Sequence, residues 1–243
     1  MTILRNNLAG TPGVTISPAN SGAGGNAYDA VNGVSGGGTV AYDDTFTLPG
    51  MSSAGKIATA GGAGSLADVR WTTSMGSQAG PVWAELVMLC DGAYPTQDLR
   101  IITYNQNGSN CGTAHLLPTG QVNIRDSLGD TIVVSDSLVP LSQFWRMEIF
   151  MIGDPAAGQV GFRLYDSPFA RSPVEAQVSA PAFNLTGPPN DYDYGPSKTT
   201  ISSGPLWLGY TALSNEDWLG PVPGGPAGGS DALAVLQLLR RRR

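Results

Sequence analysis

The sequence contains one histidine, two cysteines and few charged residues, and each shortage excludes a class of protein. Histidine-based triads and multi-histidine zinc sites need further partners that a single histidine cannot supply. We therefore expect His115 to be a hydrogen-bonded strand residue. Cys90 and Cys111 are too few for a disulfide framework in 243 residues. Isolated buried thiols are favoured over a pair joined across neighbouring strands.

Long apolar runs are also missing, since none approaches the roughly 20 residues that cross a bilayer as a helix. We therefore expect no membrane insertion. Glycine and proline, with 33 and 18 residues, form about a fifth of the chain, which excludes helical bundles and coiled coils. A hydrophobic content of 41% excludes disorder, because it is enough to build a core. The length fits one β-sandwich or barrel, folds that run to about 200–250 residues as single domains.

The charges are distributed unevenly along the chain. Arg240, Arg241, Arg242 and Arg243 account for four of the 13 basic residues, against 19 acidic ones. The rest of the chain therefore carries a net charge of about −10. Such a body repels phosphate backbones, which excludes nucleic acid as a partner. A basic end on an acidic body is typical of a docking tail.

Short apolar runs separated by turn residues predict about a dozen strands, at a spacing typical of a sandwich or barrel. The clearest run is 144–152, where Trp145, Met147, Ile149 and Met151 share one face. A loop over 153–158 then turns the chain into a returning strand. The expected strands are 39–42, 56–59, 68–72, 81–90, 99–104, 113–117, 122–126, 131–134, 144–152, 159–165, 174–178 and 206–211.

Composition divides the chain into four parts. Residues 1–36 are expected to form an N-terminal arm with a first edge strand, and 37–219 the sandwich. Within the sandwich, the proline-rich segment 180–203 is interpreted as a long functional loop. Residues 220–229 have the composition of a linker, and 230–243 are expected to form a short helical basic tail.

The tail has two interpretations. In the first, the apolar side formed by Leu233, Leu236 and Leu239 docks into a partner, and the four terminal arginines meet acidic surface nearby. In the second, the tail packs on its own sandwich or frays.

Five segments in order along the chain resemble laminin-G-like or concanavalin-like jelly rolls of phage tail proteins and related actinobacterial proteins. They are Asn7-Leu-Ala-Gly-Thr-Pro-Gly13, Ala27-Tyr-Asp-Ala-Val31, Thr39-Val-Ala-Tyr-Asp43, Thr119-Gly-Gln-Val-Asn-Ile-Arg-Asp126 and Gln159-Val-Gly-Phe-Arg-Leu-Tyr-Asp166. The resemblance implies an all-β fold, a two-sheet antiparallel jelly roll that often binds glycans or builds virion appendages. It does not imply enzyme activity.

The carboxylates do not match the pattern of a retaining glycosidase, which places two of them about 5–5.5 Å apart. On one strand this requires acids at alternating positions. Glu85 and Glu148 are each alone on their strands, and Asp191 and Asp193 alternate without a third acid. We therefore predict no catalytic residues.

No metal or cofactor is predicted, although calcium has candidate oxygen ligands in loops. These are Asp43 with Asp44, Asp191 with Asp193, and Glu216 with Asp217. Solvated loop acids and turn formers are the favoured interpretation of all three pairs.

Glycan binding uses aromatic platforms and planar polar groups. The candidates are Tyr104, Asn105 and Asn107 at a strand end, and Tyr192 and Tyr194 in the long loop. The tryptophans of the predicted strands, Trp71, Trp83, Trp145 and Trp207, are assigned mostly to the core.

These observations lead to a non-enzymatic structural and binding protein of a phage virion, a minor tail or appendage protein. Its expected partners are other virion proteins, copies of itself and a host surface glycan. The N-terminus does not resemble a signal peptide, which fits a product made in the host cytoplasm. Two alternatives stay open. One is a soluble lectin or polysaccharide-degrading enzyme, and the other is a capsid decoration or fibre protein.

Overall fold

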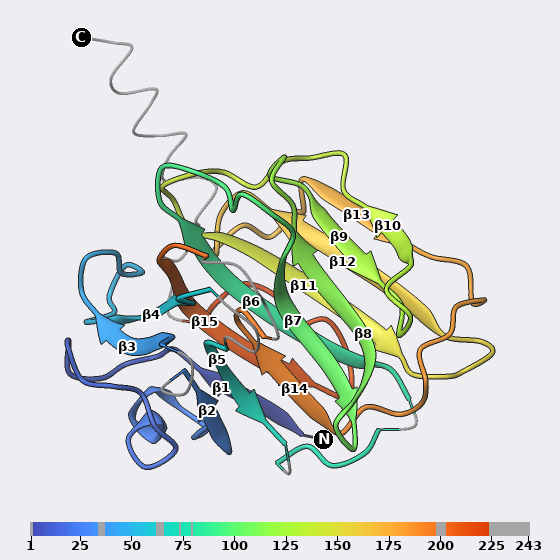
Figure 1. Ribbon diagram of the computed structural model, residues 1–243, viewed down its shortest axis with the longest axis horizontal. Coiled ribbons are helices and arrows are strands. Elements are labelled where there is room, and N and C mark those ends of the chain that lie inside the picture. Colours follow the sequence, from blue (N-terminus) through green and yellow to red (C-terminus); the bar gives the residue numbers. More distant parts are fainter. Residues whose placement is uncertain are drawn as a thin grey trace, which may run out of the picture.

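The computed structural model describes residues 2–33, 37–61, 66–72, 74–78, 80–197 and 203–223. In these residues the chain forms two antiparallel sheets, stacked as a jelly-roll β-sandwich (Figure 1). Sheet A has the order β13 (Glu175–Val178), β12 (Gln159–Tyr165), β11 (Trp145–Ile152), β6 (Val82–Cys90), β15 (Leu206–Ser214), β4 (Ala54–Ala58) and β3 (Thr39–Asp43), and β1 (Ile3–Asn6) also pairs with β15. Sheet B has the order β10 (Thr131–Val134), β9 (Val122–Arg125), β8 (Ser109–Leu116), β7 (Leu99–Gln106), β14 (Asp191–Tyr194), β5 (Asp68–Trp71) and β2 (Ala30–Asn32). A short 3-10 helix, η1 (Ser21–Gly24), follows β1.

The predicted strand 144–152 is confirmed as β11, which pairs with β12 on one side and β6 on the other. Trp145, Met147, Ile149 and Met151 are fully buried between the sheets. Alternation along a strand sends every second side chain to the same face, so these four residues fix which face of sheet A meets sheet B.

Tyrosine hydroxyls join the two sheets across the core. Tyr104 of β7 donates to the carbonyl oxygen of Ile149 at 3.1 Å, and Tyr194 of β14 donates to that of Ala212 at 2.7 Å. Each buried phenol therefore keeps a hydrogen bond while its ring fills the core. Trp71, Trp145 and Trp207 are buried as predicted, and Trp83 is half-buried.

The two cysteines are buried and free, as predicted. Burial raises the pKa of the Cys90 thiol to about 12. It also raises the pKa of Cys111 to about 11. Both groups are therefore neutral thiols of the core at neutral pH.

The interpretation of 180–203 as one long loop is wrong, because Asp191–Tyr194 forms β14 in the middle of sheet B. It pairs with β7 on one side and β5 on the other. Prolines at 188, 189 and 196 bound this strand instead of marking an uninterrupted loop. Residues 2–33, expected as an arm, contribute β1 to sheet A and β2 to sheet B.

The outward face of sheet A is covered by segments of the same chain. Leu48 and Val222 are buried there against Val87 and Tyr210, and Phe169 packs against the same cluster. We call residues 215–223 the C-terminal strap, because they follow β15 and return across this face. Residues 220–223, expected as the start of the linker, therefore pack on the sandwich.

The predicted tail residues 230–243 lie outside the described part of the chain. Within the described part, no helix is both long and apolar enough to span a membrane.

Candidate functional site on the outward face of sheet B

The outward face of sheet B is lined by polar and charged side chains, in contrast to its apolar inner face. We call this the polar face. It takes alternate residues from five adjacent strands: Asp68 and Arg70 of β5, Asp191 and Asp193 of β14, Arg100, Thr103 and Asn105 of β7, Thr113 and His115 of β8, and Asn123 and Arg125 of β9.

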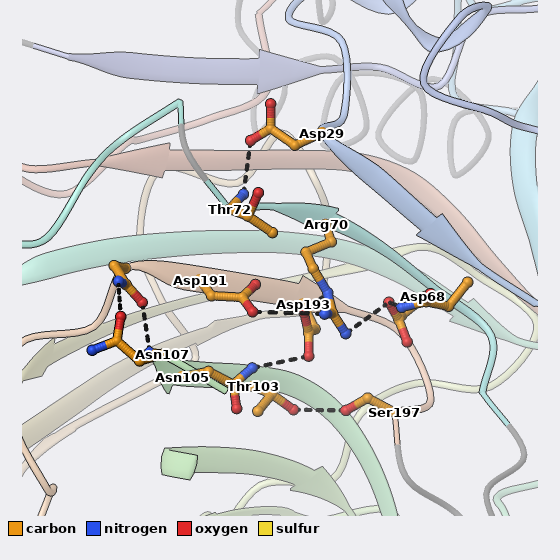
Figure 2. Close-up of polar contacts among 12 residues, drawn as sticks. Asp29, Asp68, Arg70, Thr72, Thr103, Asn105, Asn107, Asp191, Asp193 and Ser197 are labelled. Carbon is orange, nitrogen blue, oxygen red and sulfur yellow. Dashed lines mark hydrogen bonds and ion pairs between the residues drawn. The ribbon is translucent and has the colours of Figure 1, made fainter. Parts of the chain in front are cut away.

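Arg70 is the centre of an acidic cluster at one half of this face (Figure 2). Its guanidinium group pairs with Asp193, which lies opposite Arg70 in the sheet register. Asp191 approaches the same group at 3.6 Å and Asp68 at 3.7 Å. Asn32 donates to Asp68 at 2.9 Å from β2. One cation therefore holds three carboxyl groups on two neighbouring strands.

Crowding of these acids shifts their proton affinities. Burial raises the pKa of Asp193 to about 8, and Asp68 and Asp191 nearby add to the rise while Arg70 opposes it. Burial likewise raises the pKa of Asp68 to about 6, against the opposing effect of Arg70. A single guanidinium does not offset the desolvation of several carboxylates, so this cluster holds protons near neutral pH.

Amide and hydroxyl groups continue the face from Asp193 toward β7 (Figure 2). Asn105 donates to Asp193 at 3.1 Å, and Thr103 hydrogen bonds with Ser197 at 2.7 Å. At the rim, the side chain of Asn190 donates to the side chain of Asn107 at 2.9 Å.

The other half of the polar face carries basic groups. Arg100 lies opposite His115 in the register of β7 and β8, and Arg125 of β9 pairs with Asp98. His115 contacts the Thr113 hydroxyl through Nε2 at 2.9 Å, so it is the hydrogen-bonded strand residue that the sequence predicts. Burial, with Arg125 and Arg100 nearby, lowers the pKa of His115 to about 3. The imidazole is therefore neutral in ordinary buffers.

Several buried atoms of this face have no hydrogen-bond partner among the described residues. They are Nδ1 of His115, Oδ1 of Asn105, Oδ1 of Asn123 and Nε of Arg125. The side chains of His115, Asn105 and Asn123 are all more than nine-tenths buried. Buried polar atoms are normally bonded, so the face offers unfilled positions to a ligand.

The prediction that three tyrosines bind a glycan is wrong. Tyr104, Tyr192 and Tyr194 are buried in the core, because alternation on β7 and β14 turns their rings inward and their polar neighbours outward. None of them can present a platform to a sugar. Asn105 and Asn107 do lie on or beside the polar face, where β14 brings Asp191 and Asp193 next to them. The predicted assembly residues from Leu233 to Arg243 lie outside the described residues.

The calcium candidates have other partners. Arg70 lies between Asp191 and Asp193 and their neighbours, so a cation already pairs with these acids. Asp43 accepts from Trp207 and Lys56. Among the described residues, no group of three or more acidic, histidine or cysteine side chains is arranged to hold a metal ion.

A carboxylate pair that the sequence does not reveal lies on sheet A. Glu85 and Glu148 are directly opposite each other on β6 and β11, and both are buried. Burial raises the pKa of Glu85 well above its usual range, with Arg146 opposing and Glu148 adding to the shift. Glu148 accepts from Tyr165 at 2.8 Å and from the backbone of Gly220 in the C-terminal strap at 2.6 Å. The pair is therefore enclosed, and it does not face a cleft.

Comparison with solved structures places this arrangement among known folds. A cellulose-induced protein, Cip1, aligns with 76% of this chain and 88% of its own, at a TM-score of 0.51 and 15% identity. The shared feature is the fold. At this identity the likeness to Cip1 extends to the β-sandwich and no further.

More distant structures include a Trypanosoma rangeli sialidase mutant with trans-sialidase activity and the alginate lyase vAL-1 from Chlorella virus. Their TM-scores are 0.46 and 0.43, their identities 12% and 9%, and they cover 73% and 71% of this chain. The match spans 27% of the sialidase and 88% of the lyase. No protein-family model matches the sequence, and no curated protein matches it either.

Proposed function

We propose that the protein is a non-enzymatic binding protein that holds a saccharide chain on the polar face of sheet B. The observation that carries the proposal is the set of buried, unpartnered atoms on this face, on His115, Asn105 and Asn123. An unsatisfied buried polar atom costs free energy. A face that keeps several of them favours a ligand that supplies the missing bonds.

The chemistry of the face suits a polyhydroxylated ligand. Sugar hydroxyls both donate and accept, and they match the mixture of amide, hydroxyl and imidazole groups from Thr103 to Asn123. The face crosses five adjacent strands, so it extends roughly 20 Å at the usual spacing between strands. This length favours a chain of several sugar units over a single small molecule.

The charged groups support binding over hydrolysis. Arg70 and Asn105 both hold Asp193, and a carboxyl group fixed by two partners is poorly placed to move a proton to a substrate. With its pKa lowered to about 3, His115 is a weak base at neutral pH. The Glu85 and Glu148 pair on sheet A is enclosed by the C-terminal strap.

Binding to a glycan array tests this proposal. The full chain should bind at least one class of polysaccharide. A double variant, Asn105→Ala with Asn123→Ala, should weaken binding about tenfold or more, because it removes two buried amides from the face. Gln143→Ala, an exposed amide beside sheet A, is the matched control. Absence of saccharide binding would contradict the proposal, and release of shortened chains from a bound polysaccharide would overturn its non-enzymatic part.

The biological setting that we propose is a virion, in which the protein serves as a minor tail or appendage protein. The resemblance of the ordered segments supports this setting, and so does the leucine- and arginine-rich end at 233–243, which would dock on other virion proteins or on copies of the chain. A capsid decoration protein would differ in its attachment site. A lectin acting free in solution would need no such tail.

The native mass of the full chain, compared with a chain that ends at residue 229, tests the setting. A defined oligomer that becomes a folded monomer on truncation supports assembly through the tail. Particles that incorporate the truncated protein at normal occupancy would contradict it.

A further inference from the structure

Arg100 makes no direct ion pair on the polar face, although Asp193 stabilises its charge from beyond ion-pair distance. Arg100 is only partly exposed, and within the described residues its guanidinium group has neither a hydrogen bond nor an ion pair. The two other arginines on the polar face differ in this respect, since Arg70 is held by three aspartates and Arg125 by Asp98. Half-buried arginines are normally paired, because a guanidinium has five donors to satisfy.

Two buried nitrogens without a hydrogen-bond partner lie on the next two strands of the sheet after that of Arg100. His115 lies opposite it across β7 and β8, and Nδ1 of His115 is buried without a partner. Arg125, on the next strand, uses its terminal nitrogen for Asp98 but leaves Nε unpartnered. Side chains one strand apart or diagonally placed are within reach of one another when they are long. The basic half of the face therefore carries one guanidinium group without a direct protein partner and two buried nitrogens without a partner, on three adjacent strands.

The charges of Arg100 and Arg125, with His115 between their strands, favour binding of an anion. Burial lowers the pKa of Arg100, Asp193 opposes this shift and Arg125 adds to it, so Arg100 is held in surroundings that disfavour its charge. A negative group between the two arginines would relieve their repulsion and fill the free donors. A carboxylate fits best, because it is planar and accepts two parallel bonds from one guanidinium.

We infer that Arg100, His115 and Arg125 form a subsite for the carboxylate of an acidic sugar, such as a uronic acid unit. This inference rests on the proposed saccharide-binding function and specifies the ligand class. The acidic cluster around Arg70 lies at the other half of the same face, so a polysaccharide that crosses it meets opposite charges at its two ends. The subsite thereby fixes the direction of the chain as well as its charge.

The test compares two ligands with the same sugar backbone, one with free carboxylates and one without: an α-1,4-linked oligogalacturonide and its fully methyl-esterified form. Isothermal titration with the full chain should show that the acid binds about tenfold or more tightly than the ester, because the charge-assisted bonds are lost on esterification. Arg100→Gln should remove most of this preference, so that the acid and the ester bind with similar affinity. Arg171→Gln makes the same charge change at an exposed loop position away from this face, and it should keep the preference.

The outcomes separate this inference from the proposed function. Equal binding of acid and ester, with no effect of Arg100→Gln, overturns the carboxylate subsite and leaves saccharide binding intact. Binding of oligoglutamate as tightly as of the oligogalacturonide also overturns it, because the patch would then recognise any polyanion. General attraction is not expected, since the chain carries a net charge of −6. Absence of binding to every saccharide overturns both proposals.

Discussion

The outward faces of the two sheets differ in how far their charged side chains are exposed to solvent. On sheet A, Glu85, Arg146 and Glu148 are almost completely inaccessible, and the C-terminal strap and the loop after β12 close over them. On sheet B, the side chains of Arg70 and Asp191 stay 25% and 14% exposed, and several neighbours keep unfilled hydrogen-bonding atoms. Charges on the first face are enclosed by the protein itself, although Oε1 of Glu85 and two nitrogens of Arg146 also lack a hydrogen-bond partner among the described residues. Those on the second are partly available to a ligand.

The enclosure of sheet A depends on a few specific contacts. Arg146 donates to the carbonyl oxygen of Ala170 at 2.8 Å, lies over the ring of Tyr165 and faces Glu85 at 3.8 Å. Trp218 of the strap packs edge-on against Phe150, with ring centroids 5.6 Å apart. The guanidinium group of Arg163 lies over the ring of Trp218, with its central carbon 4.1 Å from the ring centroid. The strap therefore screens the buried charges from water.

Arg146→Met should have the largest effect on stability. The substitution keeps the volume but leaves Glu85 buried without its cation, and breaking a buried ion pair costs about 3–5 kcal/mol. Urea unfolding at pH 7 measures the loss. The double variant Glu85→Gln with Arg146→Met should recover most of it, because it also removes the uncompensated acid. A loss below about 1 kcal/mol for Arg146→Met alone would break the contrast between the two faces.

Arg70→Met should cost less, about 1–3 kcal/mol at neutral pH, the usual range for losing charge-assisted bonds near the surface. The loss should grow with pH. Arg70 stabilises the ionised forms of Asp68 and Asp193, and their raised pKa values, about 6 and about 8, make those forms scarce in acid. Unfolding at pH 5 and pH 9 checks this, with Arg70→Lys as the charge-preserving control. An equal or larger loss at pH 5 would contradict the prediction.

The sequence predicts a strand and its buried face where the pattern lies within that strand alone. The alternation of Trp145, Met147, Ile149 and Met151 identifies β11 and its buried face without any knowledge of its partners. β14 is only four residues long and lies between Pro189 and Pro196, so the proline-rich composition hides its alternation of aspartate and tyrosine. That alternation was the available signal, because it places Tyr192 and Tyr194 inward and both aspartates outward.

The candidate site itself could not be predicted, since it depends on strand pairing between distant segments. Arg70 meets Asp193 only because β5 pairs with β14 in one register. Glu85 meets Glu148 through the register of β6 and β11. A shift of one residue in either pairing would send these side chains to the opposite face, and composition holds no record of register. Arg100 likewise shows its lack of a direct ion pair only in the folded chain.

Asp193→Asn should change the pH dependence of stability on sheet B. The pKa of Asp193 is raised to about 8 in the folded protein, against about 3.9 for an unfolded chain. Between these values the unfolded state releases a proton that the folded state keeps, so this group makes stability fall as pH rises from about 4 to about 8. Asparagine, which cannot ionise, should flatten the fall between pH 5 and pH 8. Thermal unfolding across that range measures it, and an unchanged slope would contradict the raised pKa.

Arg100→Gln should have the smallest effect on stability, within about 0.5 kcal/mol of the unmodified protein. The side chain has no hydrogen bond or ion pair to lose among the described residues, and its removal ends both the attraction to Asp193 and the repulsion from Arg125. The same substitution is expected to abolish the preference for an acidic sugar, so stability and binding should separate at this one position. Arg146 provides the opposite case, where loss of the cation destabilises the protein without changing the polar face. A loss above about 1 kcal/mol for Arg100→Gln in urea unfolding would make Arg100 a structural residue. Its greater exposure would then no longer distinguish it from the enclosed charges of sheet A.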